Sequence, residues 1–264
     1  RMEKRKFRTS SEAVSSLPTI IPLGLSILEA STDEDAVSSF SGGYHSGLEH
    51  LRRYLSTQAA SSYKETRNQF TGDHFSTGFS PWLAQGCLSP QQIIHRLQAY
   101  EDRHGANEST KWIIFELLWR EYFRWYGAQH GAKLFKASGL IDQPSAQRFD
   151  GEAFDSWRTG TTEWPIVNAC MRELNGTGWL SNRGRQLVAS CLINELGQDW
   201  RAGAGYFEQQ LIDYDACSNW GNWQYIAGVG ADPRGGRHFD LAWQSQQWDP
   251  DKSYQKHWLA AEAI

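Results

Sequence analysis

Apolar residues recur every three or four positions along most of the chain after residue 43. One such stripe consists of Tyr44, Leu48, Leu51 and Leu55. This spacing is the period of an amphipathic α-helix. A second helix is predicted from Ser89–Pro90, because proline suits the first helical position. A third is predicted over Lys111–Gln129, with Thr110 as its N-cap. Two more are predicted from Pro165 onward and over Gly184–Leu196.

The sequence contains no segment with the alternation and β-branched enrichment typical of strands. The predicted fold class is therefore all-α. Two stretches between the helices are interpreted as long ligand-binding loops, Thr71–Ser80 and Cys217–Phe239. Residues 1–41 are rich in Ser, Thr, Glu and Ala without sustained periodicity, which predicts a tail or linker. Residues 42–264 form the predicted helical domain.

Composition narrows the possible classes of protein. The net charge of −4 and the pI near 6.1 provide no global basic field, so binding of nucleic acid requires a local patch. The apolar run Thr19–Leu28 is too short to span a membrane. The four cysteines show no metal-binding spacing, which predicts reduced thiols and a cytoplasmic protein. Most of the thirteen tryptophans are expected to fill the core.

The segment Gly178–Tyr225 mixes polar groups and large aromatic rings unusually densely. Buried polar groups cost free energy unless they are bonded, so this mixture favours a large flat ligand with many polar edges. Asp213 and Asp215 within it can also be interpreted as metal ligands, but no histidine or cysteine accompanies them at a suitable spacing. No metal site is predicted.

A second candidate lies on the helix predicted over Lys111–Gln129. Glu116, Arg120 and Arg124 share one face of that helix. They form either a salt-bridged surface or, for Glu116 among apolar neighbours, a carboxyl of raised pKa that faces a cavity.

Several motifs carry a resemblance to a known family. They are YKETRN, FSPWLAQGCLSP, FELLWREYFR, WRTG, TGWLSNRGRQ, LIDYDACSNWGNWQY and GADPRGGRHF, in this order, within Gly42 to Leu259. They resemble the helical FAD-binding domain of the photolyase/cryptochrome family, most closely its DASH type. The family also has an N-terminal α/β antenna domain, so the chain is expected to represent the FAD domain alone.

The resemblance implies FAD as the cofactor and identifies the residues that bind it. They are Tyr63, Ser76, Thr77, Gly78, Phe79, Ser80, Ile113, Glu116, Arg120, Asn182, Arg185, Asp213, Tyr214, Asp215 and Asn219. In this set Ser76–Ser80 bind the diphosphate, Asn182 lies beside flavin N5, and Asp213 and Asp215 bond the ring and ribityl region. Gly78 stands where relatives carry a basic residue.

The resemblance also implies residues for catalysis and for DNA. Glu116 is expected to hydrogen-bond a damaged pyrimidine base and Trp119 to stack on it. The expected DNA contacts are Arg67, Trp119, Arg183, Arg234 and Gln244. Trp223 and Trp200 match the first two members of a three-tryptophan electron-transfer chain, whose third position is Gln147 here. Trp164 or a surface tyrosine is a possible substitute.

The function implied is that of a photolyase enzyme. Reduced, light-excited flavin splits cyclobutane pyrimidine dimers in UV-damaged, single-stranded DNA. The alternative is a blue-light sensor or redox flavoprotein without repair, which the net negative charge, Gly78, and Asp240 in place of a usual Asn favour. The sequence makes no prediction about the oligomeric state.

Overall fold

The structure is a computed structural model that describes residues 40–141, 148–232 and 235–260. All of them belong to one compact unit, Val37–Ile264. The predicted tail over residues 1–41 lies almost wholly outside the described residues. Its last two residues contact the domain, since Phe40 packs its ring on Trp82 and Trp179 and the Ser41 carbonyl accepts a hydrogen bond from Trp82 Nε1.

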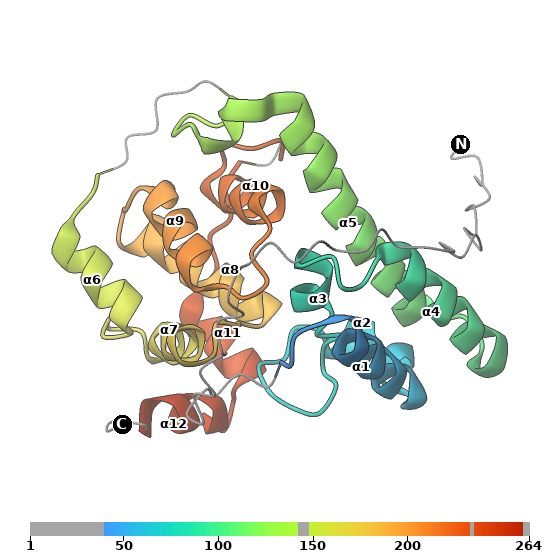
Figure 1. The fold of residues 1–264 in the computed structure, drawn as a ribbon. Coiled ribbons are helices and arrows are strands. Elements are labelled where there is room, and N and C mark those ends of the chain that lie inside the picture. Colours follow the sequence, from blue (N-terminus) through green and yellow to red (C-terminus); the bar gives the residue numbers. More distant parts are fainter. Residues whose placement is uncertain (1–39, 142–147, 233–234, 261–264) are drawn as a thin grey trace, which may run out of the picture. The chain divides into compact units, whose positions relative to one another are not determined.

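The described residues are helical, as predicted (Figure 1). The first helices along the chain are α1 (Tyr44–Ser56), η1 (Ala59–Ser61), α2 (Tyr63–Thr66), α3 (Ser80–Ala84), α4 (Pro90–His104), α5 (Glu108–His130) and η2 (Gly131–Phe135). The later ones are α6 (Gly151–Thr159), α7 (Pro165–Thr177), α8 (Asn182–Ser190), η3 (Cys191–Glu195), α9 (Trp200–Gln210), α10 (Ala216–Ala227), α11 (Leu241–Trp248) and α12 (Ser253–Ala260). The all-α fold class is confirmed, and the only β pairing among these residues is one isolated bridge, Arg148 with Gln198.

The start of α5 differs from the prediction. Thr110 was expected to be the N-cap, but the cap is Asn107, whose side chain accepts a hydrogen bond from the Thr110 amide at 2.9 Å. The Thr110 hydroxyl accepts in turn from the Asn107 amide at 3.1 Å. Because the two residues cap reciprocally, the helix begins three residues before the apolar run that signalled it.

The predicted loop Cys217–Phe239 is wrong over its first half. Helix α10 occupies Ala216–Ala227, and Asp215 caps it by accepting a hydrogen bond from the Ser218 amide at 2.9 Å. The helix ends at Gly228, whose φ of +74° is the left-handed conformation that glycine favours. The first half of the segment expected to be a ligand-binding loop is therefore a helix, and several of its residues line the cavity.

The helix expected over Gly184–Leu196 begins two residues earlier. Ser181 caps α8 by accepting from the Gly184 amide at 3.1 Å, and the last turn widens into the π-helical η3. Asn182 and Arg183 thus lie in the first turn, where the helix dipole favours negative charge.

Two large hydrophobic cores and a small cluster around Phe123, Tyr126 and Leu134 build the described part of the domain. One core fills the space among α1 to α4 and the first half of α5, around Leu51, Tyr54, Leu97 and Ile113. The larger core lies among α6 to α12, around Trp157, Leu187 and Trp200. Helix α5 contacts elements of both groups, including α2, α4 and α10. The seam between the two cores is the place where a ligand can lie without disturbing either.

Candidate functional site

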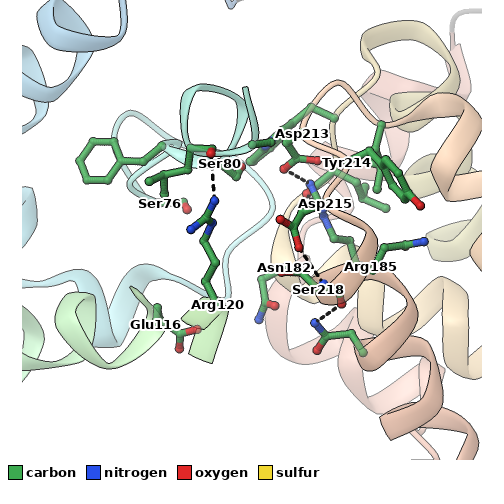
Figure 2. Close-up of a pocket in the computed structure, with 18 of the residues that line it drawn as sticks. Ser76, Ser80, Glu116, Arg120, Asn182, Arg185, Asp213, Tyr214, Asp215 and Ser218 are labelled. Carbon is green, nitrogen blue, oxygen red and sulfur yellow. Dashed lines mark hydrogen bonds and ion pairs between the residues drawn. The ribbon is translucent and has the colours of Figure 1, made fainter. Parts of the chain in front are cut away.

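A cavity of about 320 Å³ lies in this seam. All residues predicted to bind the cofactor line it, together with Trp223. Figure 2 shows Glu116 and Arg120 on one side, Ser76 on the loop before α3 with Ser80 at the start of that helix, and Asn182, Arg185, Asp213 and Asp215 on the facing wall. Sequence reasoning missed further polar lining residues, namely Trp179, Gln186, Ser218, Asn222 and Tyr225.

The loop before α3 is held from outside the cavity. The Thr66 hydroxyl donates to the Phe75 carbonyl at 2.8 Å, and Nε2 of His50, from α1, lies 2.8 Å from the Thr77 carbonyl. Gly78 has a φ of +60°, and a Cβ there would come within 3.2 Å of His50 Nε2. A side chain at position 78 is therefore disfavoured by both backbone conformation and space.

The facing wall is organised by a buried ion pair. Arg185 donates to Asp213 Oδ2 at 2.7 Å, and the Asp213 side chain is only 1% exposed. Arg185 Nε also donates to the Leu180 carbonyl at 2.8 Å, so the guanidinium orientation is fixed. Asn219, another lining residue, donates from Nδ2 to the Ala204 carbonyl at 2.9 Å.

Three buried polar atoms on the cavity wall have no hydrogen-bond partner within the protein. They are Asp213 Oδ1, Trp179 Nε1 and Gln186 Oε1. A buried polar atom left unpaired costs about 1–3 kcal/mol. All three atoms belong to side chains that line the cavity, and two acceptors and one donor match the kinds of hydrogen-bonding group found along the edges of a flavin.

Glu116 forms a second part of the site, at the α5 wall. Its Oε1 accepts from Arg67 at 2.7 Å and from Trp112 Nε1 at 2.9 Å. Burial raises the pKa of the Glu116 carboxyl, and the nearby Arg67 partly offsets this effect. Of the two interpretations of this helix face, ion pairs of Glu116 with Arg120 and Arg124 are wrong, because both arginines pair with Glu121. A Glu116 carboxyl of raised pKa that lines a cavity agrees with the structure.

Arg67, the partner of Glu116, lies near a second guanidinium group, Arg183, and each of the two lies over aromatic rings. Arg67 lies 5.6 Å from the Trp112 ring centroid, and Arg183 lies 5.6 Å from Phe239 and 5.5 Å from Trp248. Burial and the charge of Arg67 lower the pKa of Arg183. Arg183 Nε has no partner within the protein. Two cations that disfavour each other in this way are stabilised by an anionic group.

The remaining predicted site residues lie outside the cavity lining. Trp119 is one helical turn from Glu116 and is 41% exposed. Trp200 is fully buried in the larger core. Gln244 is also buried, with Oε1 accepting from Trp248 Nε1, so its position does not support a direct contact with DNA. Arg234 and Gln147 lie outside the described residues.

Other classes of site find less support. Within the described part of the chain, no helix combines the length and the apolarity needed to cross a bilayer. No group of three or more His, Cys, Asp or Glu side chains among those residues is placed to hold a metal ion.

Comparison with known proteins agrees with this geometry. Residues 112–263 match the family profile described as the FAD binding domain of DNA photolyase. The chain is 56% identical over 255 residues to cryptochrome DASH of Vibrio parahaemolyticus, covering 96% of this chain and 57% of that protein. It belongs to the photolyase/cryptochrome family. A second relative, cryptochrome DASH of Idiomarina loihiensis, is 54% identical over 94% of this chain and 56% of its own length.

Solved structures show the same relationship. A cryptochrome from Synechocystis superposes with a TM-score of 0.82 at 50% identity, over 86% of this chain and 47% of the other. A class III photolyase from Agrobacterium tumefaciens gives 0.78 at 31% identity, over the same shares. The chain thus spans about half the length of the relatives it matches. The cofactor of this photolyase/cryptochrome domain is FAD.

Proposed function

We propose that the protein to which this domain belongs repairs cyclobutane pyrimidine dimers in single-stranded DNA under blue light. FAD supplies light absorption and electron transfer when it is bound. The residues of this chain position the cofactor, receive the damaged bases and exclude water. The observation that carries the proposal is Glu116, a cavity-lining carboxyl beside both the FAD site and an exposed aromatic residue.

The cavity walls divide into two binding surfaces for FAD. The turn from Ser76 to Ser80 provides backbone amides and hydroxyls, which suit a diphosphate. The wall containing Arg185, Asp213 and Asn182 provides donors and acceptors, which suit the flavin ring and ribityl chain.

Glu116 and Trp119 are suited to receive a base. Burial raises the pKa of Glu116, and the carboxyl oxygens can accept hydrogen bonds from a pyrimidine edge. The exposed Trp119 ring offers a stacking surface, which is worth about 1–3 kcal/mol per base. A base can reach this position only after leaving its helix, and flipping costs least when the strand is already single.

Arg67 and Arg183 are placed to bind the strand backbone. Their guanidinium groups lie close enough for the charge of Arg67 to lower the pKa of Arg183. A phosphate between them would relieve this repulsion and provide an acceptor for Arg183 Nε. This local pair offers the positive charge that the chain as a whole, at −4, lacks.

The experiment uses protein with chemically reduced flavin and a single-stranded oligonucleotide that contains one thymine dimer. Glu116→Gln is expected to keep FAD and to reduce dimer splitting by about 10- to 150-fold, because a hydrogen bond to a charged intermediate is worth about 1.5–3 kcal/mol. Trp119→Ala is expected to weaken oligonucleotide binding. Trp125→Ala, a change on the same helix at a residue 74% exposed, is the matched control.

A blue-light sensor or redox flavoprotein is the competing function. It predicts full FAD occupancy but no dimer splitting by reduced wild-type protein in blue light. In that case Glu116→Gln and the Trp125 control behave alike, and the repair proposal fails.

A further inference from the structure

Two tryptophan rings are in contact where α9 and α10 pack together. The rings of Trp200 and Trp220 lie 5.7 Å apart between centroids, in an edge-to-face arrangement at 77°. Trp200 is fully buried, and its Nε1 donates to the neutral carbonyl of Ala137 at 3.1 Å. Trp220 is only partly buried and packs on the exposed ring of Phe135 at 5.0 Å. The pair therefore leads from the core toward the surface.

The surroundings of Trp220 differ from those of Trp200, whose indole N–H meets a neutral carbonyl. Its Nε1 donates to Glu208 Oε2 at 3.1 Å and lies 3.3 Å from the Tyr214 hydroxyl. Burial, together with a hydrogen bond to Glu208, raises the pKa of Tyr214 to about 12. An indole N–H and a phenol O–H thus share one carboxylate, and Glu208 itself is exposed to solvent.

A carboxylate at this place has a specific chemical consequence. When an indole loses an electron, its N–H becomes strongly acidic, and the resulting radical lasts only if a base takes the proton. Trp157 cannot release its proton in this way, because its Nε1 donates to the neutral carbonyl of Val188. Tyr206, the ring beyond Trp157, donates to the neutral amide oxygen of Asn175.

Trp220 is also connected to the FAD cavity. Trp223 lines the cavity and lies one turn after Trp220 on α10. Its ring presses on α9 at Gly203, one turn after Trp200, so closely that a Cβ there would lie 2.2 Å from the ring. The three tryptophans thus occupy one helix interface. Trp164, another candidate, lines a different cavity, with Glu195 and His238.

We propose that Trp220 is the terminal electron donor to the oxidised flavin of this protein and that Glu208 accepts its indole proton. One electron leaves Trp220 for the oxidised ring of Trp200, and the N–H proton moves to the Glu208 carboxylate, which leaves a neutral Trp220 radical. The oxidant that starts the sequence is light-excited, oxidised flavin. An external thiol returns one electron and one proton to Trp220. Gln147, without an aromatic ring, has no part in this route.

The inference rests on FAD binding but not on DNA repair. The test is flash photolysis of the protein with oxidised FAD, in which the absorption of deprotonated tryptophanyl radical is followed with time. Trp220→Phe is expected to reduce the long-lived radical at least about tenfold, while the flavin absorption band confirms that the cofactor is still bound. Trp220→Tyr is expected to restore a long-lived signal with the absorption of a tyrosyl radical.

The proton acceptor is tested separately. Glu208→Gln is expected to leave the radical protonated and to abolish the solvent deuterium isotope effect on its deprotonation. Tyr206→Phe, a change in the neutral branch, is the matched control and is expected to leave the radical unchanged. An unchanged radical yield in Trp220→Phe would overturn the inference. Dimer splitting by reduced wild-type protein is measured in parallel. A failure of the repair proposal can then be distinguished from a failure of the proposed role of Trp220.

Discussion

Glu173 is a carboxyl group that the protein holds inside its larger core. It lies on α7, is 8% exposed, and accepts a hydrogen bond from the buried hydroxyl of Tyr254 on α12. Burial raises the pKa of Glu173 to about 7, although Tyr254 and Arg185 act in the opposite direction. The Glu173 carboxyl therefore binds its proton more tightly in the folded protein than in the unfolded chain.

The effect on stability follows from the two pKa values. The interval from 4.5 to about 7 corresponds to about 3 kcal/mol of folding free energy, at about 1.36 kcal/mol per pH unit. Because the folded pKa is the higher one, this contribution is fully present below pH 4.5 and is lost as the pH rises through 7. Glu173→Gln keeps an acceptor for Tyr254 but does not ionise.

The assay is urea unfolding of wild type and Glu173→Gln at several pH values from 4.5 to 8. The variant is expected to match wild type near pH 4.5 and to exceed its free energy of unfolding by up to about 3 kcal/mol at pH 8. Glu49→Gln, on an exposed position of α1, is the control for a general charge effect. A difference between wild type and Glu173→Gln that stays constant with pH would refute the reasoning.

Two further predictions concern the FAD site. Asp215→Ala is expected to lose most bound FAD and also about 1 kcal/mol of stability, since it removes the N-cap hydrogen bond from the Ser218 amide, whereas Asp215→Asn keeps the cap. Flavin absorption measures the first effect and thermal unfolding the second. Full FAD occupancy in the alanine variant would rule out a direct role of Asp215 in binding the cofactor. His50→Ala is expected to weaken FAD binding by about 2- to 12-fold, because the bond to the Thr77 carbonyl is worth about 0.5–1.5 kcal/mol. His50→Gln, which keeps an N–H donor, should restore it in a fluorescence titration, and equal affinities for the two variants would contradict this.

Much of the fold was predictable from local patterns. The stripe through Leu51 and the Ser89–Pro90 start gave α1 and α4, because each depends only on nearby residues. Helix α10 was missed because its sequence mixes polar, aromatic and glycine residues. Helix α10 nevertheless packs closely against α5, because Gly221 has no Cβ. A Cβ at that position would lie 2.4 Å from the Phe123 ring.

The pairings within the site were less accessible to sequence reasoning. The residues that the resemblance assigns to the cofactor line one cavity, but spacing alone suggested Arg120 as the partner of Glu116. The observed partner, Arg67, lies 49 positions earlier and is brought close only when α2 packs on α5. The raised pKa of Glu173 is likewise a consequence of burial, which depends on the whole core rather than on the sequence of α7.

Light-driven repair by the protein to which this domain belongs is the central proposal. The most direct measurement is the yield of intact thymines from a dimer-containing single-stranded oligonucleotide, incubated with the flavin-reduced protein in blue light and in darkness. The account predicts restoration in light, none in darkness, and a strong loss of the light-dependent yield in Glu116→Gln with FAD still bound. Fully reduced, FAD-saturated wild-type protein that binds the oligonucleotide but restores no thymine under blue light would contradict it.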